Sequence, residues 1–177
     1  MRPDPLLMRA YQHYIQPLFP EAGTALDVAG GLGRHAIWLA RRNWAVTLLD
    51  ISDVAIAIAQ QTAAGHARQI HFQTSDLKKF KAGHTRCDLI LVFFYLERRI
   101  LPELQKALRP GGLLVYKTYT RDQRQFKGGP THPLHLLKQN ELLQAFRGLR
   151  VLHYSETIRD RGVAEFVGRK PGAGGYT

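Results

Sequence analysis

Residues 25–36, ALDVAGGLGRHA, lead from an apolar run directly into three glycines within four positions. Ordering a glycine costs more backbone entropy than ordering any other residue, so such a cluster is typical of a turn whose backbone comes close to another group. The residues after the turn, 33–42, have the composition of a helix. A buried strand, a glycine turn and a helix in this order predict one unit of an α/β fold, with a ligand near the turn.

Strand-like and helix-like segments alternate along the rest of the chain. The expected strands are 24–30, 45–50, 70–74, 87–96 and 113–120, followed by a closing pair at 150–157 and 163–170. The expected helices are 5–18, 33–42, 52–65, a helix that ends at Leu108, and one near 138–147. This order predicts a Rossmann-like, doubly wound α/β sheet, mostly parallel with an antiparallel C-terminal hairpin, and with helices on both faces.

Length and cysteine content indicate one domain in a reducing compartment. The 177 residues suit a single core, so we expect one domain over 1–177, with a leading helix over the site within 1–20 and a flexible tail at 171–177. The single Cys87 cannot form a disulfide within the chain. Neither a signal peptide nor a membrane-spanning apolar run is visible, so we expect a cytoplasmic protein without a membrane partner.

The formal net charge of +11 is unevenly distributed along the chain. Residues 1–77 carry six Lys and Arg against six Asp and Glu, whereas residues 78–177 carry nineteen against eight. Such an excess is typical either of a solvated surface or of a face that meets an anionic substrate, a nucleic acid or a membrane surface. Within it, the segment KKFK at 78–81 is a candidate for gripping phosphate.

Three acids stand where three expected strands end. Asp27 lies inside the first strand, Asp50 ends the second and Asp76 follows the third. In a parallel sheet the carboxyl ends share one edge, where ligands bind. A carboxylate after the second strand accepts hydrogen bonds from ribose hydroxyls, so the pattern predicts a ligand that contains a nucleoside. A nicotinamide dinucleotide is disfavoured, because Asp27 would repel its pyrophosphate and because an antiparallel pair follows the fifth strand.

These segments together resemble the class I S-adenosylmethionine-dependent methyltransferases over about residues 24–170. The sequences ALDVAGGLGRHA, VTLLDIS, TSDL, CDLILVFFYL and LRPGGLLVYKTYT are similar to successive motifs of that family. Its glycine motif usually reads Asp-x-Gly-x-Gly-x-Gly, and Ala29 replaces the first of these glycines here. The resemblance implies S-adenosyl-L-methionine as the cofactor. It also implies a set of cofactor-binding residues: Asp27, Ala29, Gly30, Gly31, Gly33, Arg34, Asp50, Ile51, Asp76, Leu77 and Val92.

The resemblance gives these residues separate roles. The acid in the first strand and the glycines, with Arg34, would hold the methionine end of the cofactor. Asp50 would bind the ribose, and Asp76 with Leu77 would bind the adenine. Val92 would lie beside the transferred methyl group. For Arg34 the alternative is a solvent-facing residue in the first turn of a helix.

The methyl acceptor is less constrained by the sequence than the cofactor. The ends of the fourth and fifth strands and the loop after them supply the acceptor-side candidates, which are Tyr95, Arg98, Tyr119 and His132. For each of them the alternative is a packed tyrosine or a solvated side chain. Neither a metal site nor a particular oligomer is predicted.

Residues 116–146 resemble small bacterial methyltransferases akin to tellurite- and thiol-methylating proteins, which favours a small-molecule acceptor, anionic or a soft nucleophile. The fourth strand ends in Val-Phe-Phe-Tyr, without the Asn/Asp-Pro-Pro-aromatic signature of many enzymes that methylate base amines, so a nucleic-acid substrate is disfavoured. Two alternatives stay open. One is an RNA- or protein-directed methyltransferase that uses the basic second part of the chain, and the other is a non-catalytic S-adenosylmethionine-binding module.

Overall fold

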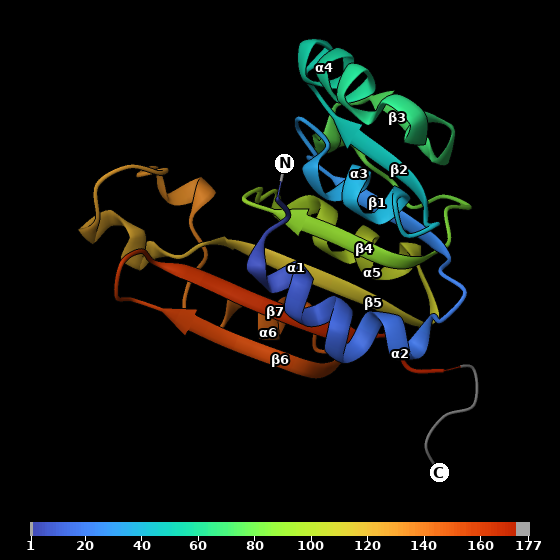
Figure 1. Ribbon diagram of the computed structural model, residues 1–177. Coiled ribbons are helices and arrows are strands. Elements are labelled where there is room, and N and C mark those ends of the chain that lie inside the picture. Colours follow the sequence, from blue (N-terminus) through green and yellow to red (C-terminus); the bar gives the residue numbers. More distant parts are fainter. Residues whose placement is uncertain (1, 173–177) are drawn as a thin grey trace.

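Seven strands form a single sheet through the middle of the protein (Figure 1), whose computed structural model describes residues 2–172. The spatial order is β3-β2-β1-β4-β5-β7-β6. The first five strands in this order run parallel, whereas β7 is antiparallel to both β5 and β6. The predicted fold class is therefore confirmed. The strands are β1 (Thr24–Val28), β2 (Ala45–Asp50), β3 (Ile70–Thr74), β4 (Cys87–Phe93), β5 (Leu108–Tyr119), β6 (Arg150–Thr157) and β7 (Val163–Arg169).

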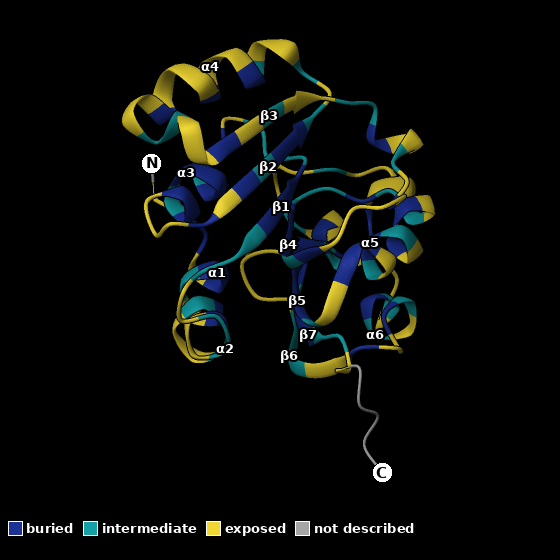
Figure 2. Cartoon of the chain, turned by 90° about the vertical axis from the view of Figure 1, so that its right-hand side faces the viewer, coloured by how far each residue is buried: buried dark blue, intermediate teal, exposed yellow. Residues whose placement is uncertain are grey.

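Helices cover both faces of the sheet (Figure 2). One face carries α1, α2, α3 and α4, which enclose a core that includes Trp44 and Leu48. The other face carries α5 and α6, where Phe146 and Phe166 pack together with a ring-centroid distance of 5.5 Å. The helices are α1 (Pro5–Ala10), a π-helical turn (Tyr11–Ile15), α2 (Gln16–Leu18), α3 (Arg34–Ala40), α4 (Asp53–Ala63), α5 (Leu101–Ala107) and α6 (Glu141–Ala145).

Local sequence signals explain several of these boundaries. The apolar segment at 87–96 forms the central strand β4, which is buried on both faces as predicted. Ser52 caps α4, because its hydroxyl accepts a hydrogen bond from the Ala55 N–H at 3.1 Å. The leading helix predicted over 5–18 begins after Asp4, whose carboxylate accepts from the Leu6 N–H at 2.9 Å.

Other boundaries differ from the prediction. Strand β4 ends at Phe93, three residues early, because the next residue, Phe94, has a left-handed backbone with φ of 58°. Strand β5 begins at Leu108 and includes the Pro-Gly-Gly segment that was expected to precede it. The helix expected near 138–147 is the shorter α6. Ala64, with φ of 42°, ends α4 in place of Gly65.

The segment between β3 and β4 leaves part of the sheet uncovered. It contains only a short 3-10 turn (Leu77–Lys79), and within residues 2–172 no α-helix packs on the α5 side of β2 and β3 (Figure 2). Strand β3 is consequently exposed at His71, Gln73 and Thr74.

Two remaining predictions concern the ends of the chain and the membrane. The tail predicted at 171–177 lies, from residue 173 onward, outside the described residues. Among the helices of residues 2–172, none is long and apolar enough to cross a membrane.

Candidate functional site

The glycine turn links β1 to α3 at the carboxyl edge of the sheet. A Cβ added to Gly31 would meet nothing within 4 Å, so the backbone there faces open space. A Cβ on Gly30 would lie 2.8 Å from Leu48 Cγ, and one on Gly33 would lie 3.0 Å from Ala59 Cβ. Of the three glycines, Gly31 therefore leaves room for a ligand, whereas Gly30 and Gly33 allow the turn and α3 to pack against β2 and α4.

Ala29 occupies a backbone conformation that suits glycine. Its φ is 56°, in the left-handed region, where a side chain costs about 1–2 kcal/mol. This is the position at which the sequence departs from the usual glycine motif. The turn thus has a glycine-like backbone at a strained alanine.

Asp50 joins the end of β2 to the glycine turn. Its Oδ2 accepts a hydrogen bond from the Gly31 N–H at 2.8 Å, and its Oδ1 accepts one from the Ser52 N–H at 2.9 Å. A carboxylate offers about four lone-pair sites, so two such bonds leave acceptor capacity for a ligand's hydroxyl groups. Beside it, Ile51 is 66% exposed and provides an apolar surface at the same edge.

Asp27 is the most deeply buried acid of the site, with 1% of its surface exposed. Its Oδ2 accepts a hydrogen bond from the Ala36 N–H in the first turn of α3, at 3.1 Å. Burial raises the pKa of this carboxyl to about 7, although the Ala36 hydrogen bond and the charge of Arg34 act in the opposite direction. A cation at the glycine turn would favour the ionised form of Asp27, whereas an anion would disfavour it.

The remaining predicted cofactor residues fall into two groups. Asp76 follows β3 and its Oδ1 accepts from the Lys78 N–H at 3.1 Å, while Leu77 beside it is buried. These two lie at the edge of the sheet as expected. Val92 is fully buried in the core on the α5 side, so its contacts are those of a packing residue.

The backbone is strained where β4 ends. Phe94 has φ of 58°, which is a true outlier for a bulky residue, and its N–H donates to the Lys117 carbonyl at 2.7 Å. Its ring lies 5.0 Å from that of Tyr119, between centroids. Strained residues of this kind cluster at functional sites. No local sequence pattern indicates this change of backbone, because the apolar run continues past this point.

Arg98 serves as a clamp on the segment before α6. Its guanidinium binds the Glu141 carboxylate with two hydrogen bonds of 2.6 and 3.0 Å and donates to the carbonyls of Leu134 and Leu136, both at 2.9 Å. Four of its five N–H donors are thereby used. These contacts indicate a structural role and leave little capacity for binding the methyl acceptor, for which the sequence had made Arg98 a candidate.

The other acceptor-side candidates lie on separate segments around the carboxyl edge. Tyr95 is half-buried, and its carbonyl accepts a hydrogen bond from the Tyr116 hydroxyl at 2.8 Å. Burial raises the pKa of the Tyr95 hydroxyl. Tyr119 packs between Phe94 and the loop at Gly129. His132 is exposed, and its Nδ1 accepts from the Leu134 N–H at 3.3 Å. The structure thus places Tyr95 and Tyr119 near the strained end of β4 and His132 on the outer loop.

A buried ion cluster joins the start of α1 to the sheet. The Lys117 ammonium lies 3.1 Å from Asp4 Oδ1 and 2.9 Å from Glu165 Oε1. The Asp4 N–H donates to His35 Nε2 at 3.3 Å, and burial lowers the pKa of His35 to about 3. The first turn of α1 is thereby attached beside the ends of β4 and β5. Sequence reasoning missed this cluster, because its members are far apart in the chain.

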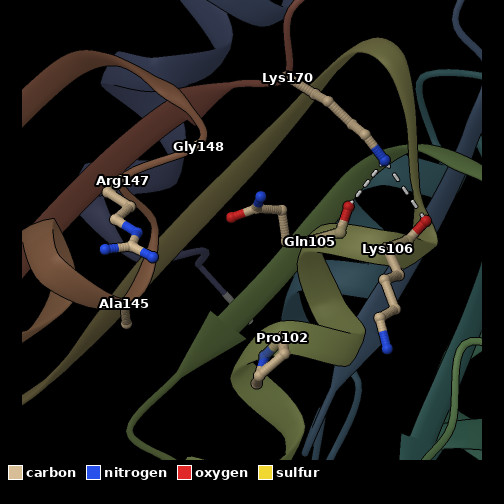
Figure 3. Close-up of a pocket in the computed structure, with 7 residues that line it drawn as sticks. All are labelled: Pro102, Gln105, Lys106, Ala145, Arg147, Gly148 and Lys170. Carbon is tan, nitrogen blue, oxygen red and sulfur yellow. Dashed lines mark hydrogen bonds between the residues drawn. The ribbon is translucent and has the colours of Figure 1, made fainter.

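A cavity of about 360 Å³ lies at the opposite end of the sheet (Figure 3). Lys170 lines it but donates to the carbonyls of Gln105 and Leu108 at 2.9 and 2.7 Å, so its charge stabilises the end of α5. This cavity is far from the acids at the strand ends. Among residues 2–172, no group of three or more His, Cys, Asp or Glu side chains is placed to hold a metal ion.

Comparison with known proteins identifies the family of this site. Residues 25–112 match a family model described as a methyltransferase domain. This part of the chain is a class I methyltransferase domain. The match begins in β1 and ends in β5, so it contains the glycine turn and all three acids. The resemblance seen in the sequence is therefore confirmed at the level of the family.

Individual relatives agree with this assignment. The chain is 32% identical over 126 residues to the tRNA 5-carboxymethoxyuridine methyltransferase of Escherichia coli K12, a match covering 64% of this chain and 47% of that protein. It thus spans about half the length of that curated relative.

Solved structures show the same fold. TehB from Haemophilus influenzae has a TM-score of 0.74 at 18% identity, over 93% of this chain and 61% of that one. The N-methyltransferase NodS from Bradyrhizobium japonicum, in complex with S-adenosyl-L-homocysteine, has a TM-score of 0.70 at 20% identity, over 95% of this chain and 89% of that one.

The residues of this methyltransferase domain fit a sulfonium nucleoside better than a dinucleotide. The Asp27 carboxylate accepts the Ala36 N–H in the first turn of α3, where a pyrophosphate would need donors and no neighbouring negative charge. Asp50 keeps lone pairs for ribose hydroxyls, and Gly31 leaves space for a chain to pass. These acceptor groups are thus suited to a ligand that is cationic at one end and carries a ribose in the middle.

Proposed function

We propose that this chain binds S-adenosyl-L-methionine across the carboxyl ends of β1, β2 and β3 and transfers its methyl group to an acceptor. The observation that carries the proposal is the 2.8 Å hydrogen bond from the Gly31 N–H to Asp50 Oδ2. This bond attaches the glycine turn to the end of β2. The two elements that would hold the ribose and the methionine are thereby fixed relative to each other.

When bound, the cofactor supplies an electrophilic methyl group on a sulfonium. The chain's own residues would orient it: Asp27 would face the cationic end, Asp50 would accept from the ribose hydroxyls, and Asp76 with Leu77 would border the adenine. Orientation of two reactants in line supplies much of the rate in such a displacement. A protonated acceptor must also lose a proton, for which His132 stays the candidate base, while Tyr95 and Tyr119 stay candidates for facing the acceptor.

The cofactor proposal is tested by calorimetry with S-adenosyl-L-homocysteine. We expect Asp50→Ala to weaken binding about tenfold to hundredfold, because a charge-assisted hydrogen bond to a ligand is worth about 1.5–3 kcal/mol. Asp53→Ala is the matched control, since Asp53 is an exposed acid three residues further on and should leave the affinity unchanged.

Two further measurements make the result decisive. Thermal unfolding of Asp50→Ala and of Asp50→Asn separates a lost ligand contact from a misfolded turn. Unchanged affinity in a folded Asp50→Ala, or NADH binding in place of S-adenosyl-L-homocysteine, would overturn the proposal. Release of S-adenosyl-L-homocysteine with any acceptor eliminates a non-catalytic binding module.

For the acceptor, a small molecule is the first candidate, supported by the resemblance of residues 116–146 to small bacterial methyltransferases. The contacts of Arg98 remove one argument for an anionic small acceptor, because Glu141 already neutralises that guanidinium. RNA is the second candidate. It is supported by the 32% identity to a tRNA methyltransferase and by a positively charged groove on the uncovered face of the sheet.

A further inference from the structure

Two adjoining hollows lie on the part of one sheet face that no α-helix of residues 2–172 covers. One, of about 410 Å³, is at the amino ends of β1 and β2; the other, of about 440 Å³, reaches Ser75 beyond the carboxyl end of β3. Both are lined by Leu26, Thr47, His71 and Thr85, so they form one continuous groove along the strands. The residues of β2 that line it run from Ala45 to Leu49, a distance of about 13 Å at 3.3 Å per residue.

The walls of this groove are positively charged. Arg68 and Arg86 line one hollow and Lys79 and Lys81 line the other, whereas none of the described residues that line either hollow is Asp or Glu. We call this site the basic groove. The Lys79 side chain is 86% exposed and lies 3.9 Å from Asp76, at the outer limit of an ion pair. Its charge is therefore available to a ligand.

The shape of the wall is fixed by contacts with α5. The Ala82 N–H donates to Glu103 Oε2 at 3.0 Å, and the other oxygen of Glu103 binds Lys106 at 3.0 Å. The loop that carries Lys79 and Lys81 is thus attached to the body of the protein. A ligand would meet these cations in a preformed arrangement, which reduces the entropy that binding must offset.

The floor offers polar and planar groups. Thr47 of β2 and His71 and Gln73 of β3 line it, and Phe80 adds an aromatic ring to the wall. A positive groove combined with planar side chains is the arrangement that binds single-stranded nucleic acid, in which the cations follow the phosphates and the bases stack. A membrane surface would require exposed large apolar residues, and none of the described residues that line the groove is of this kind.

We propose that the basic groove binds single-stranded RNA. Its carboxyl end, at Ser75, directly precedes Asp76 and Leu77 of the cofactor site. A strand lying in the groove would therefore lead toward the edge of the sheet where methyl transfer is proposed. The proposal deepens the alternative in which RNA is the methyl acceptor. Methylation of the bound RNA rests on the proposed function, whereas RNA binding in the groove does not.

The test is fluorescence anisotropy of a labelled, uridine-rich RNA of about 12 nucleotides with the full chain and no cofactor. Four phosphate contacts predict a slope of about −3 for the logarithm of affinity against the logarithm of salt concentration. We expect Arg68→Glu/Lys81→Glu to weaken binding at least about tenfold, because two phosphate contacts are replaced by repulsion.

The matched control is Arg41→Glu/Arg147→Glu. It changes the net charge by the same amount at exposed residues outside the groove, one of them beside the cavity of Figure 3. We expect it to weaken RNA binding less than about threefold. Circular dichroism of both double variants establishes that they are folded.

Several outcomes would overturn the proposal. They are no RNA binding at low salt, equal losses in both double variants, and groove-dependent binding to vesicles of phosphatidylserine and phosphatidylcholine without binding to RNA. Calorimetry with S-adenosyl-L-homocysteine is run in parallel. If the wild-type chain binds RNA through the groove but not this ligand, the proposed methyl transfer fails while the basic groove stands.

Discussion

At the residue scale, two side chains occupy left-handed backbone positions at the edges of the candidate site. Ala29 and Phe94 have φ of 56° and 58°, and each conformation costs about 1–3 kcal/mol. The first shapes the turn where the methionine end would lie, and the second ends β4 beside Tyr95. Strain in both places means that the surrounding structure holds the site in one geometry before a ligand binds.

Asp27 makes the stability of the protein depend on pH. Its pKa of about 7 in the folded chain lies above the ordinary value of 3.8, so between pH 3.8 and pH 7 the folded chain holds a proton that the unfolded chain has lost. The contribution of Asp27 to the free energy of unfolding is fully present below pH 4 and is lost as pH rises through 7. Over this range the contribution of Asp27 to the free energy of unfolding falls by at most about 1.4 kcal/mol per pH unit.

We therefore compare the free energy of unfolding of Asp27→Asn with that of the wild type. The variant's advantage should be larger at pH 8 than at pH 5, since the amide carries no buried charge. Urea denaturation across this range measures the difference, and subtraction of the two profiles cancels the opposite effect of His35. Asp53→Asn, at an exposed acid, should show no such trend. Parallel profiles for Asp27→Asn and the wild type would contradict the raised pKa.

The acids of the site were predictable from the sequence, but the contacts of several neighbours were not. Asp27, Asp50 and Asp76 stand at ends of apolar runs, and such positions share one edge of a parallel sheet. The burial of Val92 and the use of Arg98 by Glu141 depend on segments distant in the chain. No local pattern reports such partners.

At the scale of elements, β2 and β3 were predicted well because each is bounded by a clear change in composition. Strands β2 and β3 match their predicted ranges of 45–50 and 70–74. The end of β4 was wrong, because the apolar run continues while the backbone changes at Phe94. The uncovered face of β2 and β3 follows from the segment between β3 and β4, which is rich in Lys and carries no helical apolar stripe.

The contacts of Arg98 tie the short 3-10 turn (Arg98–Ile100) to the segment that enters α6. We expect Arg98→Ala to lower the free energy of unfolding by about 2 kcal/mol, because it leaves the half-buried Glu141 without its charged partner. Affinity for S-adenosyl-L-homocysteine should stay unchanged. Arg99→Ala is the control, since Arg99 is largely exposed and lies 3.7 Å from Glu97, and it should cost less than about 0.5 kcal/mol.

Urea denaturation and calorimetry on the same samples separate the two roles of Arg98. A stable Arg98→Ala variant that loses turnover with an anionic acceptor would restore the binding role suggested by the sequence. Arg98→Lys should not recover the stability, because an ammonium cannot reproduce the paired bonds to Glu141 and the two carbonyl contacts.

At the scale of the whole molecule, charge is segregated. The excess of +11 comes from residues 78–177, yet the basic groove also recruits Arg68 from the first part of the chain. Folding therefore gathers cations that the linear sequence keeps apart. Folding also gathers acids that are far apart in the sequence: Asp4 and Glu165 both contact Lys117. These contacts connect the first turn of α1 with β5 and β7.

The Lys117 cluster predicts a strong coupling between the two ends of the chain. Lys117→Met should lower the free energy of unfolding by about 3–5 kcal/mol, because it leaves the buried Asp4 carboxylate without a cation, while Glu165 keeps its ion pair with Arg9 at 2.7 Å. Lys117→Met/Asp4→Asn should recover at least about 1 kcal/mol of this loss, since one of the two charges is then removed.

Urea denaturation of the single and double variants gives the coupling energy directly. Lys106→Met is the control: it removes a lysine that is equally close to its glutamate, at 3.0 Å, but 64% exposed, and exposed pairs contribute at most about 1 kcal/mol. If Lys117→Met cost no more than this control, the cluster would not hold the leading helix to the sheet. The position of that helix beside the candidate site would then depend on its apolar contacts and on the Arg9–Glu165 ion pair.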